Sequence, residues 1–311
     1  MSLPRPAHQR RWPLFVSISP TAVVVAAPAK LNLFLEVLGR RPDGYHELAT
    51  LMVAVDWCDT VELSQGRDHG WTFTCEPAGS APSGQDNLAW RAACLLAERT
   101  GVETAGLALR LVKRLPAQAG LGGGSSDAAA VLLGLNQLWK LALTNDALVA
   151  MGSAVGSDVP FFLTAPAAWC TGRGEVVTEE NMVRPLHFVL VCPPVGLSTA
   201  RVYAALQVPA QPRTDIALRT AWRSSDVDEL GRHLFNRLEE PAFHLEPLLE
   251  RLHRRLTQVS PFGARLSGSG SALFALCRSR REAVQVAEAF LRQRPGNEPP
   301  SRVLVVRTVA P

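Results

Sequence analysis

The chain has 311 residues, of which 47% are hydrophobic and 19% charged, and its formal net charge is +4 at pH 7. A disordered chain is much poorer in apolar residues, and this length suits two domains of ordinary size. The small basic excess is scattered, without basic runs interleaved with aromatic residues, so we expect no nucleic-acid partner. The six cysteines are widely separated and form no CxxC pair, which favours reduced core residues of a cytoplasmic protein.

The N-terminal segment is apolar in patches from Trp12 to Ala27, but Pro13, Pro20 and Pro28 interrupt it. No apolar run approaches the ~20 residues that a membrane-spanning helix needs. We therefore expect no membrane partner, and we expect residues 1–22 to be a loosely ordered extension before the first strand.

Hydrophobic patterns in the first half of the chain predict strands followed by helices. The expected strands are 21–27, 31–37, 51–55, 60–63, 71–75 and 107–111, and a helix is expected at 87–98. A long helix free of proline is expected at 127–143, and a second at 144–155 with Thr144 as its N-cap. Together these elements predict a first domain at 23–180.

The pattern restarts near residue 184 and predicts a second domain at 181–311. A buried strand is expected at 186–192, with helices near 200–206 and 247–259. The end of the chain predicts a strand at 263–267, a turn at 268–270, a strand at 272–277, a helix at 281–294 and a strand at 302–308. This closing series indicates a compact α+β domain.

Four glycines, Gly120, Gly122, Gly123 and Gly124, come immediately before the long predicted helix. Glycine lets the backbone approach an anion closely, while the amides of the first helical turn and the helix dipole point toward it. Ser125 and Ser126 can donate to phosphate oxygens or approach a phosphate-bound Mg²⁺. A flexible turn is the alternative, but a loop with two hydroxyls at a strong helix predicts a phosphate site.

Two common phosphate-binding motifs do not fit this loop. A Walker A loop requires a lysine after the last glycine, and none follows Gly124. No acidic residue is suitably placed for a dinucleotide ribose. Asp127 lies where a carboxylate favours the helix dipole, so we expect it to be structural.

Three motifs in this order resemble the GHMP kinases: Pro-Ala-Lys-Leu-Asn at 28–32, the glycine-rich loop at 116–126, and Leu-Ser-Gly-Ser-Gly at 266–270. Arg-Pro-Asp-Gly-Tyr-His at 41–46 and Gly-Ser-Asp-Val-Pro at 156–160 are similar to the branch of that family that acts on a cytidine-diphosphate-linked methylerythritol. The resemblance covers about residues 24–277. It implies a two-domain α+β fold, with an N-terminal domain like domain 2 of ribosomal protein S5 and a ferredoxin-like C-terminal domain.

The resemblance also implies a reaction. It is the ATP-dependent phosphorylation of the 2-hydroxyl of that small-molecule substrate, a step of non-mevalonate isoprenoid synthesis, with Mg²⁺ accompanying the ATP. Asp158 matches the family's catalytic aspartate and would accept or orient the hydroxyl proton. Lys30 matches the lysine paired with it and would stabilise developing negative charge. Without the motifs, the two residues would be a turn aspartate and a surface lysine.

The resemblance assigns further residues to the two ligands. Tyr45 and His46 would hold the cytosine, and the substrate-binding set is Asn32, Tyr45, His46, Tyr203, Gly268 and Ser269. Tyr203 is equally well explained as a core residue. The ATP-binding set is Asn87, Leu88, Lys113, Pro116, Ala117, Gln118, Ala119, Gly120, Leu121, Gly122, Gly123, Gly124, Ser125 and Ser126. Asn87 could instead, or in addition, be a helix N-cap, and Lys113 a surface residue; Gln118 stands where related loops carry a small residue.

Two other functions stay open from the sequence. A GHMP kinase of the mevalonate or homoserine type would use the same loop without a cytosine clamp. A silent nucleotide-binding protein would not need both Lys30 and Asp158. The sequence names no protein ligand for Mg²⁺, and we expect a monomer or a weak homodimer.

Overall fold

The computed structural model describes residues 15–65, 70–102 and 106–309. Most of the predicted extension, residues 1–14, lies outside these ranges, whereas Phe15–Ile18 forms a strand, β1, that pairs antiparallel with β2. The chain folds into two sheets with helices packed on them, which confirms the predicted α+β class. No helix in the described ranges is long and apolar enough to cross a membrane.

The first sheet is built on two long, antiparallel strands, β2 (Ala22–Arg40) and β3 (His46–Gln65). Beyond β3 lie β5 (Leu107–Val112) and then β4 (Trp71–Glu76), while β6 (Ala167–Gly172) and β7 (Val176–Glu179) continue from the other half of β3. The two-residue strand β9 (Phe235–Asn236) pairs with β2.

Both β2 and β3 are single long strands where the sequence predicted two short strands each. The strand register of β2 shifts between Pro28 and Ala29 and again between Asn32 and Phe34. Proline lacks an amide hydrogen and is tolerated at such irregularities, so Pro28 bends the strand without ending it. Separate strands at 21–27 and 31–37, and at 51–55 and 60–63, were therefore wrong.

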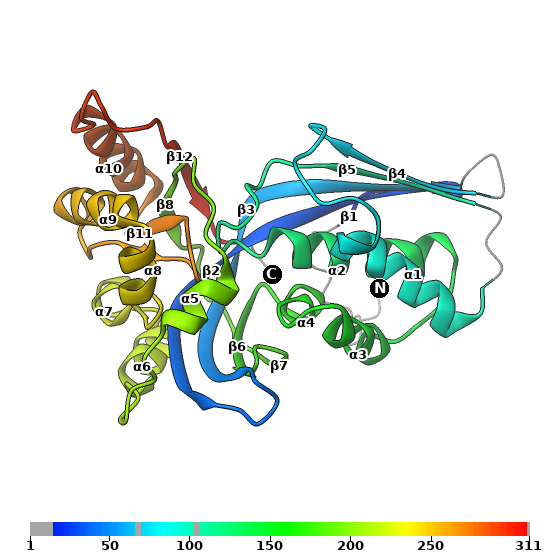
Figure 1. Ribbon diagram of the computed structural model, residues 1–311, viewed down its shortest axis with the longest axis horizontal. Coiled ribbons are helices and arrows are strands. Elements are labelled where there is room, and N and C mark those ends of the chain that lie inside the picture. Colours follow the sequence, from blue (N-terminus) through cyan, green and yellow to red (C-terminus); the bar gives the residue numbers. More distant parts are fainter. Residues whose placement is uncertain (1–14, 66–69, 103–105, 310–311) are drawn as a thin grey trace, which may run out of the picture.

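Four helices cover one face of this sheet (Figure 1). They are α1 (Leu88–Thr100), α2 (Gly123–Leu138), α3 (Asn145–Val155) and α4 (Val159–Thr164), with a short 3-10 turn, Gly84–Asp86, before α1. The expected helix at 127–143 in fact starts four residues earlier and ends at Leu138, because Lys140 and Ala142 have positive φ values of 55° and 53°. A common apolar core of alanine, leucine and valine side chains joins the helices to the sheet.

The second sheet is antiparallel, in the order β10 (Arg265–Leu266), β11 (Leu273–Cys277), β8 (His187–Cys192) and β12 (Arg302–Arg307). Its helices are α5 (Thr199–Ala205), α6 (Ile216–Ser224), α7 (Val227–His233), α8 (Glu239–Leu245), α9 (Pro247–Val259) and α10 (Arg280–Arg292). Figure 1 shows this part beside the bent end of β2 and β3.

The two parts share one apolar cluster. It contains Leu31 and Phe34 of β2 together with Phe188 of β8 and Phe274 of β11, all buried. Across the predicted boundary at residue 180, β9 also joins the first sheet and Thr308 bridges to Val55. The boundary itself stays a prediction.

Candidate active site

The glycine-rich loop forms the N-terminus of α2. Gly122 is the N-cap, with φ of 69°. In the first helical hydrogen bond, the amide of Ser126 donates to the carbonyl of Gly122 at 2.9 Å. The amides of residues 123–125 therefore precede the helical hydrogen-bond pattern and are left for a ligand. This is the geometry of an anion site at a helix terminus.

The two serines of the loop differ in exposure. Ser126 is 1% exposed, and its hydroxyl has no hydrogen-bond partner within the described ranges. Ser125 is half-buried and lies beside Gly156, just before the turn that carries Asp158. Ser125 is thus the serine of the loop that is open to solvent.

The loop is bonded to the C-terminal part of the molecule. The carbonyl of Gln118 accepts from the amides of Leu197 and Ser271, at 3.1 and 3.3 Å, and that of Ala119 accepts from Ala272 at 3.0 Å. Gln118 adopts a positive φ of 53°, which is unusual for a residue with a side chain. Gln118, which stands where related loops carry a small residue, therefore has a strained backbone that these hydrogen bonds hold in place.

Lys30, Asn32 and Asp158 meet next to this loop. The Lys30 ammonium is buried, donates a hydrogen bond to Asn32 Oδ1 and lies 3.9 Å from Asp158 Oδ2. Asn32 Nδ2 in turn donates to Thr50 Oγ1 at 2.8 Å, which fixes the amide orientation. Burial lowers the pKa of Lys30, and the Asp158 carboxylate partly opposes this shift.

Asp158 lies just before α4 with its side chain about one third exposed. It is therefore open to a ligand, while Lys30 reaches it from inside the protein. A carboxylate beside a buried ammonium can hold a hydroxyl and offset the charge that develops on its oxygen. The predicted pair is brought together.

The turn at 266–270 closes this side of the site. A Cβ on Gly268 would lie 2.9 Å from Lys30 Nζ and 3.3 Å from Asn32 Oδ1, so the turn passes directly against both side chains. Asn236 Nδ2 donates to the carbonyl of Gly268 at 2.7 Å, and the hydroxyls of Ser269 and Thr199 are 2.8 Å apart.

The three predicted aromatic residues occupy two places. His46 packs against Tyr203 of α5, with ring centroids 5.0 Å apart and planes inclined by 31°. Tyr45 is 53% exposed and instead lies under Arg173, whose guanidinium carbon is 4.8 Å from the ring centroid. Burial, with a smaller effect of the nearby Arg40, lowers the pKa of His46.

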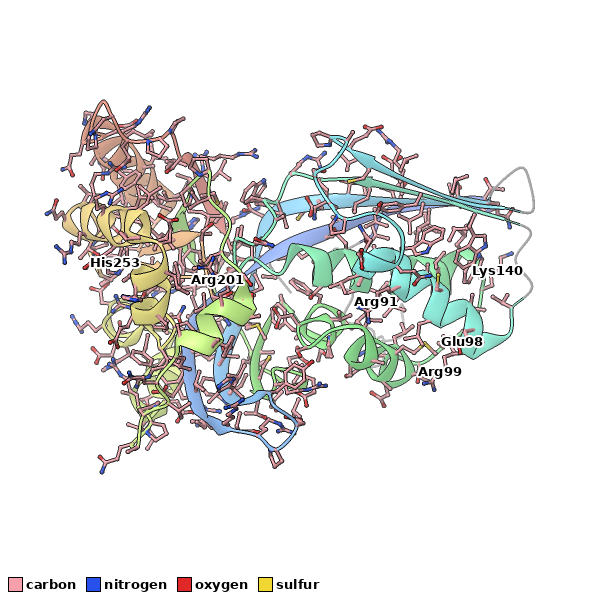
Figure 2. All side chains as sticks on the ribbon, in the orientation of Figure 1. Arg91, Glu98, Arg99, Lys140, Arg201 and His253 are labelled. Carbon is pink, nitrogen blue, oxygen red and sulfur yellow. The ribbon has the colours of Figure 1, made fainter. Side chains whose placement is uncertain are left out.

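Tyr203 combines the two roles that the sequence allowed. It packs on the apolar core of the C-terminal part, and it also faces His46. Burial raises the pKa of its phenol, and the nearby Asp158 carboxylate adds to the shift. Figure 2 shows Arg201 on the same short helix, which borders both parts of the molecule.

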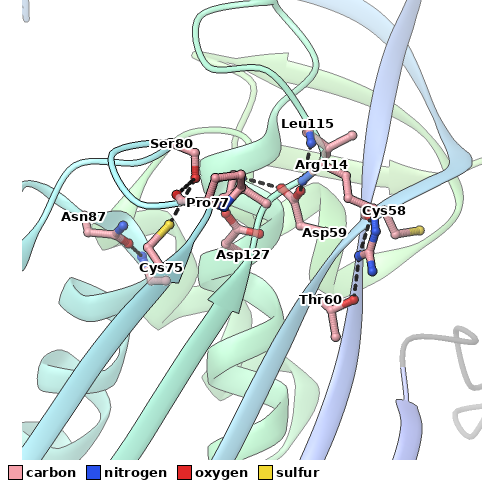
Figure 3. A network of polar contacts seen from close by, with 12 residues as sticks. Cys58, Asp59, Thr60, Cys75, Pro77, Ser80, Asn87, Arg114, Leu115 and Asp127 are labelled. Atoms are coloured by element: carbon pink, nitrogen blue, oxygen red, sulfur yellow. Dashed lines mark hydrogen bonds and ion pairs between the residues drawn. The ribbon is translucent and has the colours of Figure 1, made fainter.

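Lys113 lies in a buried ionic network rather than on the surface. Its ammonium contacts carboxylate oxygens of Asp59 and Asp127, the latter at 2.7 Å, and its side chain is 6% exposed. Asp59 also accepts from the backbone amides of Arg114 and Leu115. Figure 3 shows Asp59 and Asp127 on either side of the chain that leads into the loop. Burial raises the pKa of Asp127, and its second oxygen is unpartnered within the described ranges.

Asn87 and Leu88 lie at the start of α1. The Asn87 side chain accepts from the amides of Ala89 and Trp90 and donates to the carbonyl of Pro82, so it is an N-cap. A Cβ on Gly124 would lie 3.6 Å from Leu88 Cδ1, which places Leu88 against the loop.

Sequence reasoning missed several residues of this region. Asp59 lies between the expected strands at 51–55 and 60–63 and belongs to no motif, and its role depends on Lys113, 54 residues away. Thr199 carried no motif signal. Arg173 stands in Gly-Arg-Gly between two strands, and its proximity to Tyr45 becomes visible only in the folded chain.

Comparison with known proteins defines the class. The sequence profiles described as "GHMP kinases N terminal domain" and "GHMP kinases C terminal" match residues 87–165 and 217–296. A solved homoserine kinase from Cytophaga hutchinsonii has a TM-score of 0.75 at 21% identity, covering 94% of this chain and 96% of its own, which shows the shared fold.

More similar proteins define the family within that class. The 4-diphosphocytidyl-2-C-methyl-D-erythritol kinase of Geobacter metallireducens is 40% identical, covering 86% of this chain and 94% of its own length. That of Pelotomaculum thermopropionicum is 37% identical over 93% and 99%. A crystal structure of 4-(cytidine 5'-diphospho)-2C-methyl-D-erythritol kinase has a TM-score of 0.76 at 34% identity, covering 93% and 100%. The chain belongs to the family of 4-diphosphocytidyl-2-C-methyl-D-erythritol kinases.

Proposed function

We propose that this protein transfers the γ-phosphate of ATP to the 2-hydroxyl of 4-diphosphocytidyl-2-C-methyl-D-erythritol, giving the 2-phosphate and ADP in non-mevalonate isoprenoid synthesis. The contact between Lys30 and Asp158 beside the glycine-rich loop carries this proposal. Phosphoryl transfer requires positioning and charge stabilisation more than covalent chemistry, and both are available here.

The loop amides and Ser125 would hold the ATP phosphates, and Leu88 would contact the base. Asp158 would accept or orient the hydroxyl proton, and Lys30 would stabilise the charge on the reacting oxygens. Asn32, Gly268 and Ser269 border the same space and would contact the substrate. His46, Tyr203 and Tyr45 would hold the cytosine.

Mg²⁺ would arrive with the nucleotide. Within the described ranges no group of three or more histidine, cysteine or acidic side chains could hold a metal ion. Mg²⁺ keeps water and phosphate oxygens and needs only one or two protein ligands, and the half-buried Ser125 hydroxyl at the head of α2 would supply one. The ion would neutralise charge on the phosphates.

Lys113 would support the loop through its ion pairs rather than by neutralising ATP, because two carboxylates already share its charge. Three further properties stay proposals: a cytoplasmic location, a monomer or weak homodimer, and the absence of nucleic-acid partners.

The decisive experiment compares ADP formation with diphosphocytidyl-methylerythritol, mevalonate and homoserine as acceptors. We expect turnover with the first substrate and little with the other two. Preference for mevalonate or homoserine would contradict the proposal, and no acceptor-dependent ADP would indicate a silent nucleotide-binding protein.

A further inference from the structure

The turn between β6 and β7 connects the predicted cytosine-binding region to the catalytic carboxylate. At its start, the amide of Gly172 donates to Glu47 Oε1 at 3.1 Å, and Glu47 also pairs with Arg41 of the Tyr45 hairpin. On its far side, a Cβ on Gly174 would lie 3.6 Å from Asp158 Oδ1. Arg173 thus follows a residue tied to the Tyr45 hairpin and precedes one that faces Asp158, and its own guanidinium lies over Tyr45.

The Arg173 guanidinium has free donor groups. The backbone amide of Arg173 donates a hydrogen bond to Glu175 Oε2 at 2.6 Å. The side-chain Nε of Arg173 is 3.7 Å from Glu175 Oε1, which is beyond ordinary hydrogen-bond distance. In the described part of the chain, this guanidinium forms no hydrogen bond, although it is ion-paired with Glu175 and helps to lower the pKa of the Asp43 carboxyl. A guanidinium has five N–H donors in one plane, so Arg173 can lie flat on Tyr45 and still offer donors at its edge.

Two neighbouring cations, Lys30 and Arg41, have closer polar partners than Arg173 has. Lys30 is buried with Asn32 and Asp158, and Arg41 pairs with Asp43 and Glu47. The Arg173 side chain is 29% exposed, which leaves it accessible but partly shielded from water. A charge in such a place binds an anion more strongly than a fully solvated one.

The proposed substrate carries two phosphates between its cytidine and the methylerythritol that reacts. With cytidine near Tyr45 and the hydroxyl at Asp158, these phosphates must cross the space between them. We propose that Arg173 binds this diphosphate through its guanidinium edge while its face orders the Tyr45 ring, and so selects a diphosphate-bearing substrate. This inference rests on the proposed function.

The test compares the binding of CDP and of cytidine, with the nucleotide site filled by a non-hydrolysable ATP analogue. Arg173→Met keeps an apolar chain over Tyr45 but removes all donors, Arg173→Lys keeps the charge without the planar fork, and Arg99→Met is the matched control on α1, where Figure 2 shows it. We expect Arg173→Met to weaken CDP about 10- to 100-fold, the range for a charge-assisted hydrogen bond, and cytidine less than about twofold. Arg173→Lys should fall between, and Arg99→Met should match wild type.

Steady-state kinetics adds a second readout. Arg173→Met should raise KM for the diphosphocytidyl substrate, with KM for ATP unchanged. Equal weakening of CDP and cytidine would show that Arg173 only orders Tyr45, and unchanged binding of both would show no role; either result overturns the inference. A wild-type enzyme that neither binds CDP nor phosphorylates the substrate would instead refute the proposed function.

Discussion

Gly120 of the phosphate loop lies directly against the carbonyl oxygen of Ser267 in the C-terminal turn. A Cβ on Gly120 would overlap with that oxygen and lie 3.0 Å from the amide nitrogen of Gly270. The Ser267 hydroxyl also donates to the Gly120 carbonyl at 3.0 Å. The two glycine motifs are therefore in van der Waals contact through their backbones.

Gly120→Ala should be strongly destabilising. The φ of Gly120 is 71°, a conformation that costs a residue with Cβ about 1–2 kcal/mol, and the overlap with Ser267 adds to this. We expect a loss of about 3 kcal/mol or more in the free energy of unfolding, and weaker ATP binding. Urea denaturation measures the first and calorimetry the second.

Gly39→Ala is the matched control, because a Cβ there meets nothing within 4 Å. It should leave stability within about 0.5 kcal/mol of wild type. Equal stability of the two variants would contradict the contact between Gly120 and Ser267.

Asp158→Asn should remove catalysis and leave ATP binding intact. The amide keeps the shape of the side chain but neither accepts a proton nor balances Lys30, so kcat should fall about 10²- to 10⁴-fold. Lys30→Ala should lower kcat similarly. Calorimetry with an ATP analogue and turnover assays separate the two effects, with Glu98→Gln on α1 as a control. A parallel loss of ATP affinity in Asp158→Asn would indicate a structural role.

Tyr45→Ala should act on the acceptor substrate. The exposed ring has few packing partners besides Arg173, so the fold should be little affected. We expect a higher KM for the diphosphocytidyl substrate and an unchanged KM for ATP. His46→Ala should also raise the substrate KM, because it removes one partner of the Tyr203 pair. An unchanged substrate KM in Tyr45→Ala would refute the cytosine assignment.

Lys113→Met should destabilise the fold because it leaves Asp59 and Asp127 buried together without a cation. Breaking a buried ion pair in this way costs about 3–5 kcal/mol. Arg110 offers the matched control, since it joins two carboxylates, Glu62 and Glu76, on the exposed side of the same sheet. Arg110→Met should have a much smaller effect by urea denaturation, and equal losses would contradict the role of burial.

Glu239 predicts a pH dependence of stability. Burial raises its pKa from 4.5 to about 7, against the opposing effects of Arg265 and of the Leu266 amide, which donates at 2.9 Å. A raised carboxyl pKa means that the unfolded chain loses its proton first, so stability present below about pH 4.5 is lost as pH rises to about 7.

Glu239→Gln should abolish this dependence. Relative to wild type, the variant should gain up to about 3 kcal/mol between pH 4.5 and pH 8, at ~1.4 kcal/mol per pKa unit. The exposed neighbour variant Glu240→Gln should follow wild type. Denaturation curves at several pH values test this, and parallel curves for wild type and Glu239→Gln would refute the raised pKa.

The sequence predicted those features that depend on local pattern. The α+β class and the closing strands and helix follow from periodicity, and the structure agrees with them. The glycine-rich loop does lie at a helix N-terminus, while phosphate binding there stays a prediction. The meeting of Lys30 with Asp158 was implied by the family resemblance rather than by local pattern. Short elements such as α4 and β9 were missed, because their few residues carry too little periodicity and form through tertiary packing.

Features that depend on distant partners were not accessible in the same way. Lys113 read as a surface residue or an adenine contact because its two carboxylates lie on other elements. Tyr45 and His46 are adjacent in sequence, yet Tyr45 lies in the bend before β3 and His46 begins that strand, and only His46 is seen to pack on Tyr203. The motif groups the two residues without saying which neighbour each ring faces, and their joint role at the cytosine stays a prediction.

The amides of Ser271 and Ala272 donate to the carbonyls of Gln118 and Ala119, so the phosphate loop depends on residues that are synthesised much later than the loop itself. The phosphate loop is synthesised when little more than a third of the chain exists, but its backbone partners follow about 150 residues later. A nascent chain ending before residue 271 would thus contain every loop glycine and the hydrogen bond from Leu197 to Gln118, but not the two bonds from Ser271 and Ala272. We therefore expect the loop to gain its full set of backbone hydrogen bonds only as translation nears its end.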